Sequence, residues 1–190
     1  MTVEVEAKMK VADLDVVRER LRAAGATRVG ERLELNAFFD TPERGLKSRD
    51  EGLRIRAMTD ERGVETVVMT FKGPHAGAED ALKRREEIEF VVGSFEDART
   101  LLGRLGYPPT LAFEKRRETW SIGDCLVELD TLPHLGTFVE IEGDANAIAG
   151  VRTTLGLDGE PLITRGYIGM MSRLVAQRPS LGPTVRFADV

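Results

Sequence analysis

The eight residues from Val3 to Lys10, V-E-V-E-A-K-M-K, alternate strictly between apolar and charged side chains. Side chains of a β-strand point alternately to its two faces, so this pattern predicts a strand with one buried apolar face. The other face places Glu4 and Glu6 in line with Lys8 and Lys10. In an antiparallel sheet such a face usually meets water, and for one strand alone that is the simplest interpretation.

The same period of two recurs along most of the chain, and the charges on the polar faces are sorted by sign. The carboxylates come in pairs two residues apart: Glu4 with Glu6, Glu87 with Glu89, Glu128 with Asp130, and Glu140 with Glu142. The cations on such faces are Lys8, Arg54, Arg56, Lys72, Arg85, Lys115 and Arg117. A solvated face would mix the signs, so the sorting indicates a sheet curled into a barrel with its charged faces inward.

Acids and bases enclosed together must pair or bind ions. Two carboxylates at positions i and i+2 can approach one divalent cation, and Mg²⁺ and Mn²⁺ favour oxygen ligands. Arginine binds phosphate through two N–H groups, and lysine acts as a point charge. A strand that carries both kinds of residue therefore indicates a metal site beside a phosphate site. The predicted ligand is a polyanion together with divalent cations.

Three segments carry the start and stop signals of α-helices. Caps are expected at Asp13, Ser94 and Asp144, and each segment ends at a glycine. A weaker helical pattern covers about residues 165–175. Because helices are few and strands many, the predicted fold class is α+β with an antiparallel sheet. The same order of acid pair and capped helix in both halves predicts two β-α-β-β repeats.

The chain of 190 residues is expected to form one domain over residues 1–177, followed by a loosely ordered tail over 178–190. The net charge of -5 predicts that the protein does not bind nucleic acid, and the lack of a long apolar stretch predicts that it does not cross a membrane. The charged strand at the N-terminus leaves no room for a signal peptide, and Cys125 is the single cysteine. We therefore expect a cytoplasmic protein, as a monomer or homodimer.

Several other features are expected to be structural. The polar segments 41–52 and 73–83 are predicted to be mobile loops at the rim of the barrel. Packing or surface roles are expected for His75, His134, Cys125, Met170 and Met171. Arg116 falls on the opposite face of its strand from Lys115 and Arg117.

The stretch E-V-E-A-K at Glu4 to Lys8 resembles the ExExK signature of the CYTH superfamily, named for class IV adenylyl cyclases and thiamine triphosphatases. Further similar motifs follow in order: F-F-D-T-P, G-L-R-I-R, T-F-K-G-P, R-E-E-I-E, E-K-R-R-E, V-E-L-D and L-G-T-F-V-E-I-E. ExExK alone is a weak motif, but the ordered series runs from Val3 to about Tyr167. The resemblance implies an eight-stranded antiparallel β-barrel, the triphosphate tunnel, with a charged interior and helices packed outside.

The resemblance also implies roles for individual residues. The implied ligands of Mg²⁺ or Mn²⁺ are Glu4, Glu6, Glu128, Asp130, Glu140 and Glu142. The implied triphosphate contacts are Lys8, Arg54, Arg56, Lys72, Arg85, Lys115 and Arg117. Among these sets, the residues implied to be catalytic are Glu4, Glu6, Lys8 and Lys115. Glu87 and Glu89 are implied to hold the basic residues in place or to lie near the substrate.

Members of this superfamily cyclise or hydrolyse substrates that bear a triphosphate. The chain looks most similar to class IV adenylyl cyclases, which convert ATP to cyclic AMP and pyrophosphate. The His-Phe pair that precedes ExExK in some cyclases is absent, so an inorganic, nucleoside or thiamine triphosphatase stays open as an alternative. A non-catalytic module that binds polyphosphate or nucleotide is a third possibility, and the full set of carboxylates favours an enzyme.

Overall fold

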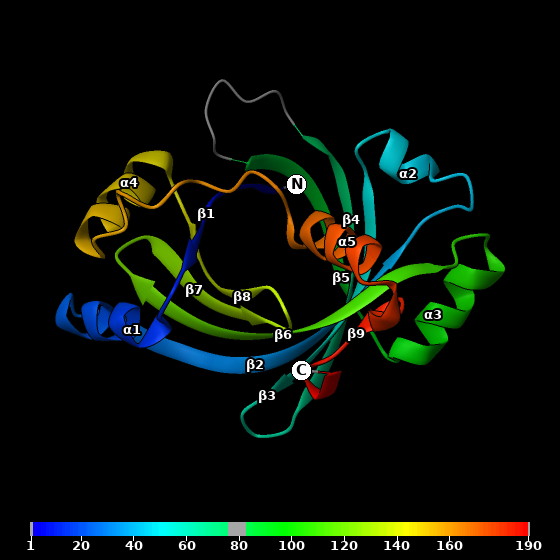
Figure 1. Cartoon of the computed structure of the whole chain (residues 1–190), viewed down its shortest axis with the longest axis horizontal. Helices are drawn as coiled ribbons and strands as arrows, with labels where there is room; N and C mark the ends of the chain where they lie inside the picture. Colours follow the sequence, from blue (N-terminus) through cyan, green and yellow to red (C-terminus); the bar gives the residue numbers. More distant parts are fainter. Residues whose placement is uncertain (1, 76–82, 190) are drawn as a thin grey trace.

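Figure 1 shows the computed structural model of the chain, a strongly curved sheet with helices around it. It describes the backbone of residues 2–75 and 83–189 and the side chains of residues 5–74 and 86–189. The strands are β1 (Thr2–Val11), β2 (Thr27–Phe39), β3 (Gly52–Asp60), β4 (Glu65–His75), β5 (Lys83–Val92), β6 (Pro109–Ile122), β7 (Cys125–Leu132), β8 (Gly136–Glu142) and β9 (Thr184–Val185). The α-helices are α1 (Leu14–Ala23), α2 (Gly45–Ser48), α3 (Phe95–Arg104), α4 (Ala145–Thr154) and α5 (Tyr167–Gln177).

The sheet is a ring of eight antiparallel strands. Its order is β2-β3-β4-β5-β1-β8-β7-β6, and a further pairing of β2 with β6 joins the two ends of this order. Each of these strands therefore pairs with two neighbours, which covers the strand edges. β9 pairs in parallel with the part of β6 that β7 does not reach. The predicted α+β fold with an eight-stranded antiparallel barrel is confirmed.

The two halves of the chain repeat one order of elements. The first half runs β1-α1-β2-β3-β4, with α2 inserted before β3, and the second runs β5-α3-β6-β7-β8. In the ring, β1 pairs with β5 and β2 with β6, so exchanging the two halves maps the strand order onto itself. The predicted repeat is therefore present. Each unit contains one strand more than the expected β-α-β-β, because three strands rather than two follow each helix.

The three capped helices begin where the sequence predicts. The side chains of Asp13, Ser94 and Asp144 accept hydrogen bonds from backbone N–H groups in the first turns. A glycine with positive φ follows each of these helices, such as Gly156 at 60°. Glycine adopts this left-handed conformation without strain, which ends the helix and redirects the chain.

The outer face of the ring is apolar and three helices cover it. α1 and α4 pack over β1, β7 and β8, where Met9, Val127 and Ile141 are fully buried. α3 packs over β2 and β3 around Ile55. Because side chains alternate between the two faces of a strand, the charged residues between these apolar ones point into the ring.

α5 differs from the predicted arrangement, in which the helices lie outside. Phe113 and Phe138 share the inward faces of β6 and β8 with Lys115 and Glu140, and they pack against Met171 of α5. One end of the inner face is therefore apolar, and α5 covers it from within the ring (Figure 1). The packing role expected for the methionines of this helix fits its burial of Met171.

Two segments have more regular structure than the sequence predicts. In the segment 178–190, Val185 is fully buried, and the carbonyl of Pro183 accepts a 2.8 Å hydrogen bond from the N–H of Ala112. In the segment 41–52, α2 forms because the Asp40 carboxylate accepts hydrogen bonds from the backbone N–H groups of Thr41, Leu46 and Lys47. Of the segment 73–83, residues 76–82 lie outside the described part of the chain. No described helix combines the length and the apolar character that a membrane crossing requires.

Candidate active site

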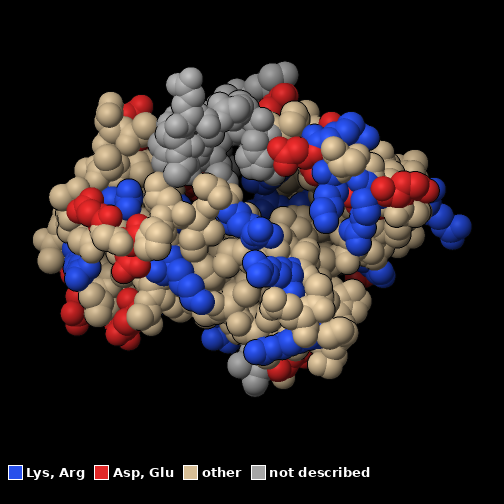
Figure 2. Space-filling model, turned by 45° about the horizontal axis from the view of Figure 1, so that its top comes forward, with Lys and Arg blue, Asp and Glu red and all other residues tan. Residues whose placement is uncertain are grey.

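The ring encloses a cavity of about 870 Å³ with strongly charged walls. Among the described residues that line it, ten are Lys or Arg and seven are Asp or Glu. Figure 2 shows a hollow in one face of the molecule with Lys and Arg side chains gathered around it. A positive excess inside a chain whose net charge is -5 suits this cavity to an anion.

The structure brings together six of the seven predicted triphosphate-binding residues. The cavity is lined by Lys8, Arg54, Arg56, Lys72, Lys115 and Arg117. The side chain of the seventh, Arg85, lies outside the described residues. The six come from β1, β3, β4 and β6, which meet around one space because the sheet curls into a ring.

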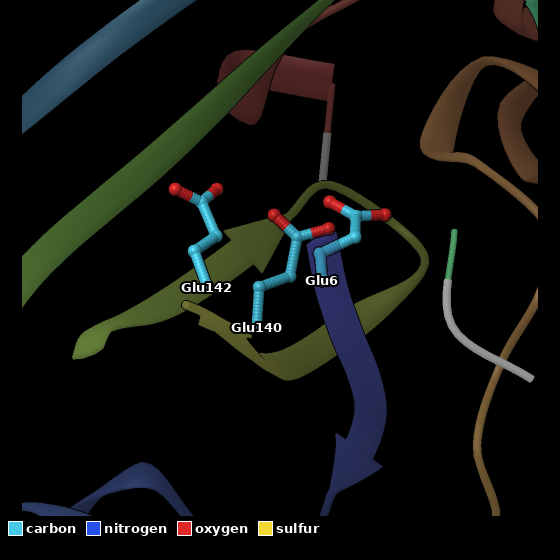
Figure 3. A group of neighbouring side chains, drawn as sticks. All are labelled: Glu6, Glu140 and Glu142. Carbon is cyan, nitrogen blue, oxygen red and sulfur yellow. The ribbon is translucent and has the colours of Figure 1, made fainter. Parts of the chain in front are cut away.

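Three of the predicted metal ligands form one group, called here the acid group: Glu6 of β1 with Glu140 and Glu142 of β8 (Figure 3). Each offers a carboxylate oxygen, and these oxygens all lie within 4.8 Å of one another. Strand register causes this, because Glu6 lies opposite Glu142 in the β1–β8 pair. Oxygens of this kind at this separation fit Mg²⁺ or Mn²⁺. The Lys8 Nζ lies 2.5 Å from a Glu140 oxygen, so the cationic side chains of the cavity lie directly beside the acid group.

Two other predicted metal ligands, Glu128 and Asp130, do not join the acid group. Asp130 is fully buried and accepts two hydrogen bonds from Arg117, with Nε–Oδ1 at 2.7 Å and Nη2–Oδ2 at 2.5 Å. Glu128 also forms an ion pair with Arg117. Neither carboxylate is among the described residues that line the cavity. The side chain of Glu4 lies outside the described residues.

Burial and neighbouring charges shift the ionisation of the site in opposite directions. Burial alone would raise the pKa of Glu140, but the charges of Lys8 and Arg117 hold that pKa well below its usual range. Burial and repulsion from Arg117 lower the pKa of Lys115 to about 8, against the attraction of Asp130. At neutral pH, Glu140 is therefore ionised and most of Lys115 still carries its proton.

Sequence reasoning missed a buried acid beneath the cations. Glu34 of β2 is fully buried, with its oxygens 3.3 Å from Lys115 Nζ and 3.6 Å from Arg56 Nη1. Burial would raise the pKa of Glu34, but the positive charges of Lys115 and Arg56 keep that pKa well below its usual range. The stretch R-L-E-L-N at residues 32–36 has the period of two that places Glu34 on an inward face.

Sequence reasoning also missed Tyr167, at the start of α5. Its hydroxyl donates a 2.8 Å hydrogen bond to Asp130 Oδ2, and its ring centroid lies 4.0 Å from Lys8 Nζ. Burial and the charges of Asp130 and Glu140 raise the pKa of Tyr167 well above its usual range, so the phenol keeps its proton and acts as a donor. A single tyrosine after a glycine gives no periodic signal by which it could have been found.

Glu87 and Glu89 hold cations, as the resemblance implies for one of their two roles. Glu87 lines the cavity and forms an ion pair with Lys72, and a Glu89 oxygen lies 3.8 Å from Arg54 Nη2. The Nε of Arg54 is buried without a hydrogen-bond partner among the described residues. Burial and repulsion from Arg56 lower the pKa of Arg54. An anion in the cavity would supply the missing partner.

The residues expected to be structural lie away from the cavity where their side chains are described. His134 sits in the β7–β8 turn with a φ of 59°, and Cys125 is buried at the start of β7. Arg116 stacks on Phe187 with 4.6 Å between its guanidinium carbon and the ring centroid, outside the tunnel. The side chain of His75 lies outside the described residues.

Comparison with known proteins shows which family this chain is similar to. The model of the CYTH domain matches residues 2–167. An adenylate cyclase of Aeromonas hydrophila is 30% identical over 175 residues, which cover 86% of each protein. Two solved structures are similar to this one. A protein of Pyrococcus horikoshii has a TM-score of 0.75 at 26% identity, over 90% of this chain and 99% of that chain. A Hippeastrum protein described as having a dominant triphosphatase activity has a TM-score of 0.62 at 21% identity, over 93% of this chain and 96% of that chain.

Proposed function

Because the chain belongs to the CYTH family, we propose that it is a divalent-metal-dependent enzyme acting on a substrate that bears a triphosphate. The observation that carries this proposal is the contact between the acid group and the cations of the cavity, made by Glu140 and Lys8 at 2.5 Å. A divalent cation on the acids and phosphate oxygens on the cations would be direct neighbours. Phosphate oxygens commonly complete the ligand shell of Mg²⁺ in enzymes.

Each part of the cavity would have its own role. The acid group would hold Mg²⁺ or Mn²⁺, and the ion when bound would neutralise charge on phosphate oxygens. Glu4, Glu128 and Asp130 stay as predicted ligands of the metal. Of these, Glu128 and Asp130 are paired with Arg117, as described above. The triphosphate would be bound by Lys8, Arg54, Arg56, Lys72, Arg85, Lys115 and Arg117. Fixed charges in an enclosed space stabilise a transition state more strongly than the same charges in water.

ATP is the favoured substrate and its cyclisation the favoured reaction. The A. hydrophila relative, which is 30% identical over 86% of each protein, carries the name of an adenylate cyclase. In this reaction the ribose 3′-oxygen attacks the α-phosphorus. The bond from that phosphorus to the β-phosphate oxygen breaks, pyrophosphate leaves and the hydroxyl proton is released. The cavity residues then act by holding the triphosphate and neutralising its charge.

A triphosphatase is the second candidate, and the activity described for the Hippeastrum structure favours it. Here the oxygen of water attacks the γ-phosphorus, the bond to the β-phosphate oxygen breaks, the diphosphate leaves, and orthophosphate and a proton are released. Both reactions use the same charged platform. They differ in which phosphorus lies next to the attacking oxygen.

Product analysis separates the candidates. The purified chain is incubated with ATP and either Mg²⁺ or Mn²⁺, and the products are resolved by chromatography. Cyclic AMP with pyrophosphate supports the cyclase, and ADP with phosphate supports the triphosphatase. An absence of turnover with ATP, tripolyphosphate and thiamine triphosphate would contradict the enzymatic proposal and favour a binding module.

A further inference from the structure

Tyr167 is the residue through which α5 reaches the charged part of the tunnel. It is the first residue of the helix, directly after the N-cap residue Gly166. Its ring packs edge-on against Phe138, with centroids 5.3 Å apart and an interplanar angle of 71°. This packing fixes the ring at the boundary between the apolar end of the inner face and the charged cavity, where its hydroxyl meets Asp130.

The hydroxyl of Tyr167 shares one acceptor oxygen with two cations. Oδ2 of Asp130 lies 2.8 Å from Tyr167 Oη, 2.5 Å from Arg117 Nη2 and 3.4 Å from Lys115 Nζ. Asp130 is fully buried and is not among the described residues that line the cavity. It therefore acts on a ligand in the cavity through Arg117 and Lys115.

The ring of Tyr167 contacts the lysines directly. Lys8 Nζ lies 4.0 Å from the ring centroid and Lys115 Nζ lies 5.4 Å from it. The face of an aromatic ring carries partial negative charge and attracts an ammonium group at such distances. One side chain thus contacts both lysines that the family resemblance implies to be catalytic, one on β1 and one on β6.

We propose that Tyr167 is a positioning residue for the triphosphate: its hydroxyl acts through Asp130, and its ring acts directly, to hold Lys8 and Lys115 toward the cavity. This inference rests on the proposed function. Without the hydroxyl, Asp130 Oδ2 is shared by Arg117 and Lys115 alone, which draws the Lys115 ammonium toward Asp130 and away from a bound phosphate.

The first test measures the affinity for tripolyphosphate by calorimetry without divalent metal, so that no turnover occurs. Tyr167→Phe keeps the ring and removes the hydroxyl, and we expect about tenfold weaker binding, as for the loss of one hydrogen bond to a charged group. Tyr167→Leu also removes the ring and should bind more weakly still. The matched control is Tyr107→Phe, because Tyr107 is the other of the two tyrosines and packs in the cluster under α3, outside the tunnel.

The second test asks whether the hydroxyl acts through Asp130. In an Asp130→Asn background, adding Tyr167→Phe should change the tripolyphosphate affinity much less than it does in the wild type. An undiminished effect in that background would overturn the proposed route. Circular dichroism of each variant confirms that the proteins compared are folded.

A spectroscopic readout covers the case in which Asp130→Asn does not fold. Binding of an anion beside Lys8 and Lys115 changes the field on the Tyr167 ring, so it should give a tyrosine band in the ultraviolet difference spectrum. The band should be lost in Tyr167→Phe and kept in Tyr107→Phe. If the wild type binds tripolyphosphate but Tyr167→Phe keeps both the affinity and the band, the positioning role is wrong while the proposed function stands. A wild type that does not bind tripolyphosphate contradicts both.

Discussion

Strands β7 and β8 lie side by side and carry carboxylate pairs of equal spacing, but the two pairs face different partners. On β8, Glu142 lies opposite Glu6 of β1. On β7, Asp130 lies opposite Arg117 of β6. Two facing acids repel each other unless cations lie beside them, as Lys8 Nζ lies 3.6 Å from a Glu6 oxygen, whereas Asp130 faces an arginine directly. For Glu142 and Asp130, the cross-strand partner rather than the E-x-E or E-x-D pattern therefore decides whether the carboxylate meets another acid or a base. Glu140 of the acid group pairs with both Lys8 and Arg117 and so links the two sets.

The largest effect is expected from a change to the carboxylate pair of β8. Glu142→Gln should lower turnover of the triphosphate substrate at least about a hundredfold, because it removes a charged oxygen ligand from the acid group. The protein should stay folded, and its metal-free form should unfold at the same or a higher temperature, since repulsion between the acids is reduced. Turnover is measured against Mg²⁺ concentration, with Glu19→Gln on the exposed side of α1 as the control. Wild-type turnover with unchanged metal dependence in Glu142→Gln would refute the assignment.

A smaller effect is expected from a change to the carboxylate pair of β7. Asp130→Asn should lower the free energy of unfolding by about 3 kcal/mol, because Arg117 stays buried after losing a charged partner. The Mg²⁺ concentration that gives half-maximal turnover should stay at its wild-type value. Denaturant unfolding and a metal titration give the two numbers. A stable variant that needs much more Mg²⁺ would show that Asp130 is a metal ligand and that the two strands share one role.

The smallest effect concerns pH and Lys115, the cation of β6 that lies beside Asp130. The pKa of Lys115, lowered to about 8, predicts that the ammonium loses its proton as pH rises through that value. Affinity for tripolyphosphate should then fall about fivefold between pH 7 and 9, if the neutral amine binds about ten times more weakly than the ammonium. Lys115→Arg keeps its charge over this range, so the ratio of the two affinities isolates the effect from titration of the ligand. An equal fall in both proteins would mean that Lys115 does not titrate in this range.

The inward faces could be predicted from the sequence because the period of two is a local property. Lys115 and Arg117 share one face of the strand once β6 forms. The partner of each charge is not local. Glu6 meets Glu142 through the register of strands far apart in the chain, and that register is set by the ring as a whole. Pattern reading therefore grouped the carboxylates as one metal set, whereas the register gives them different neighbours.

The helices could also be predicted, three from their polar caps and α5 from the weaker helical pattern of residues 165–175, whereas the place of α5 in the ring and the presence of β9 could not. Asp13 and Ser94 predict the start of their helices, because each side chain accepts a hydrogen bond from a backbone N–H group a few residues away. The place of α5 depends instead on Phe113 and Phe138, whose end of the inner face would otherwise be open. β9 depends on the length of β6 beyond the end of β7. Such positions follow from packing between distant segments and leave no periodic trace.

The difference between the two related halves of the ring affects the orientation of a ligand in the tunnel. Where β1 and β8 set Glu6 opposite Glu142, the corresponding strands of the other half, β5 and β4, set Glu87 opposite Lys72. Two equal walls would accept a guest with unlike ends, such as ATP, either way round. Here one wall offers paired acids and the other an acid already matched with a base, so the two ways round differ in energy. This difference between the walls favours one orientation of such a ligand in the tunnel.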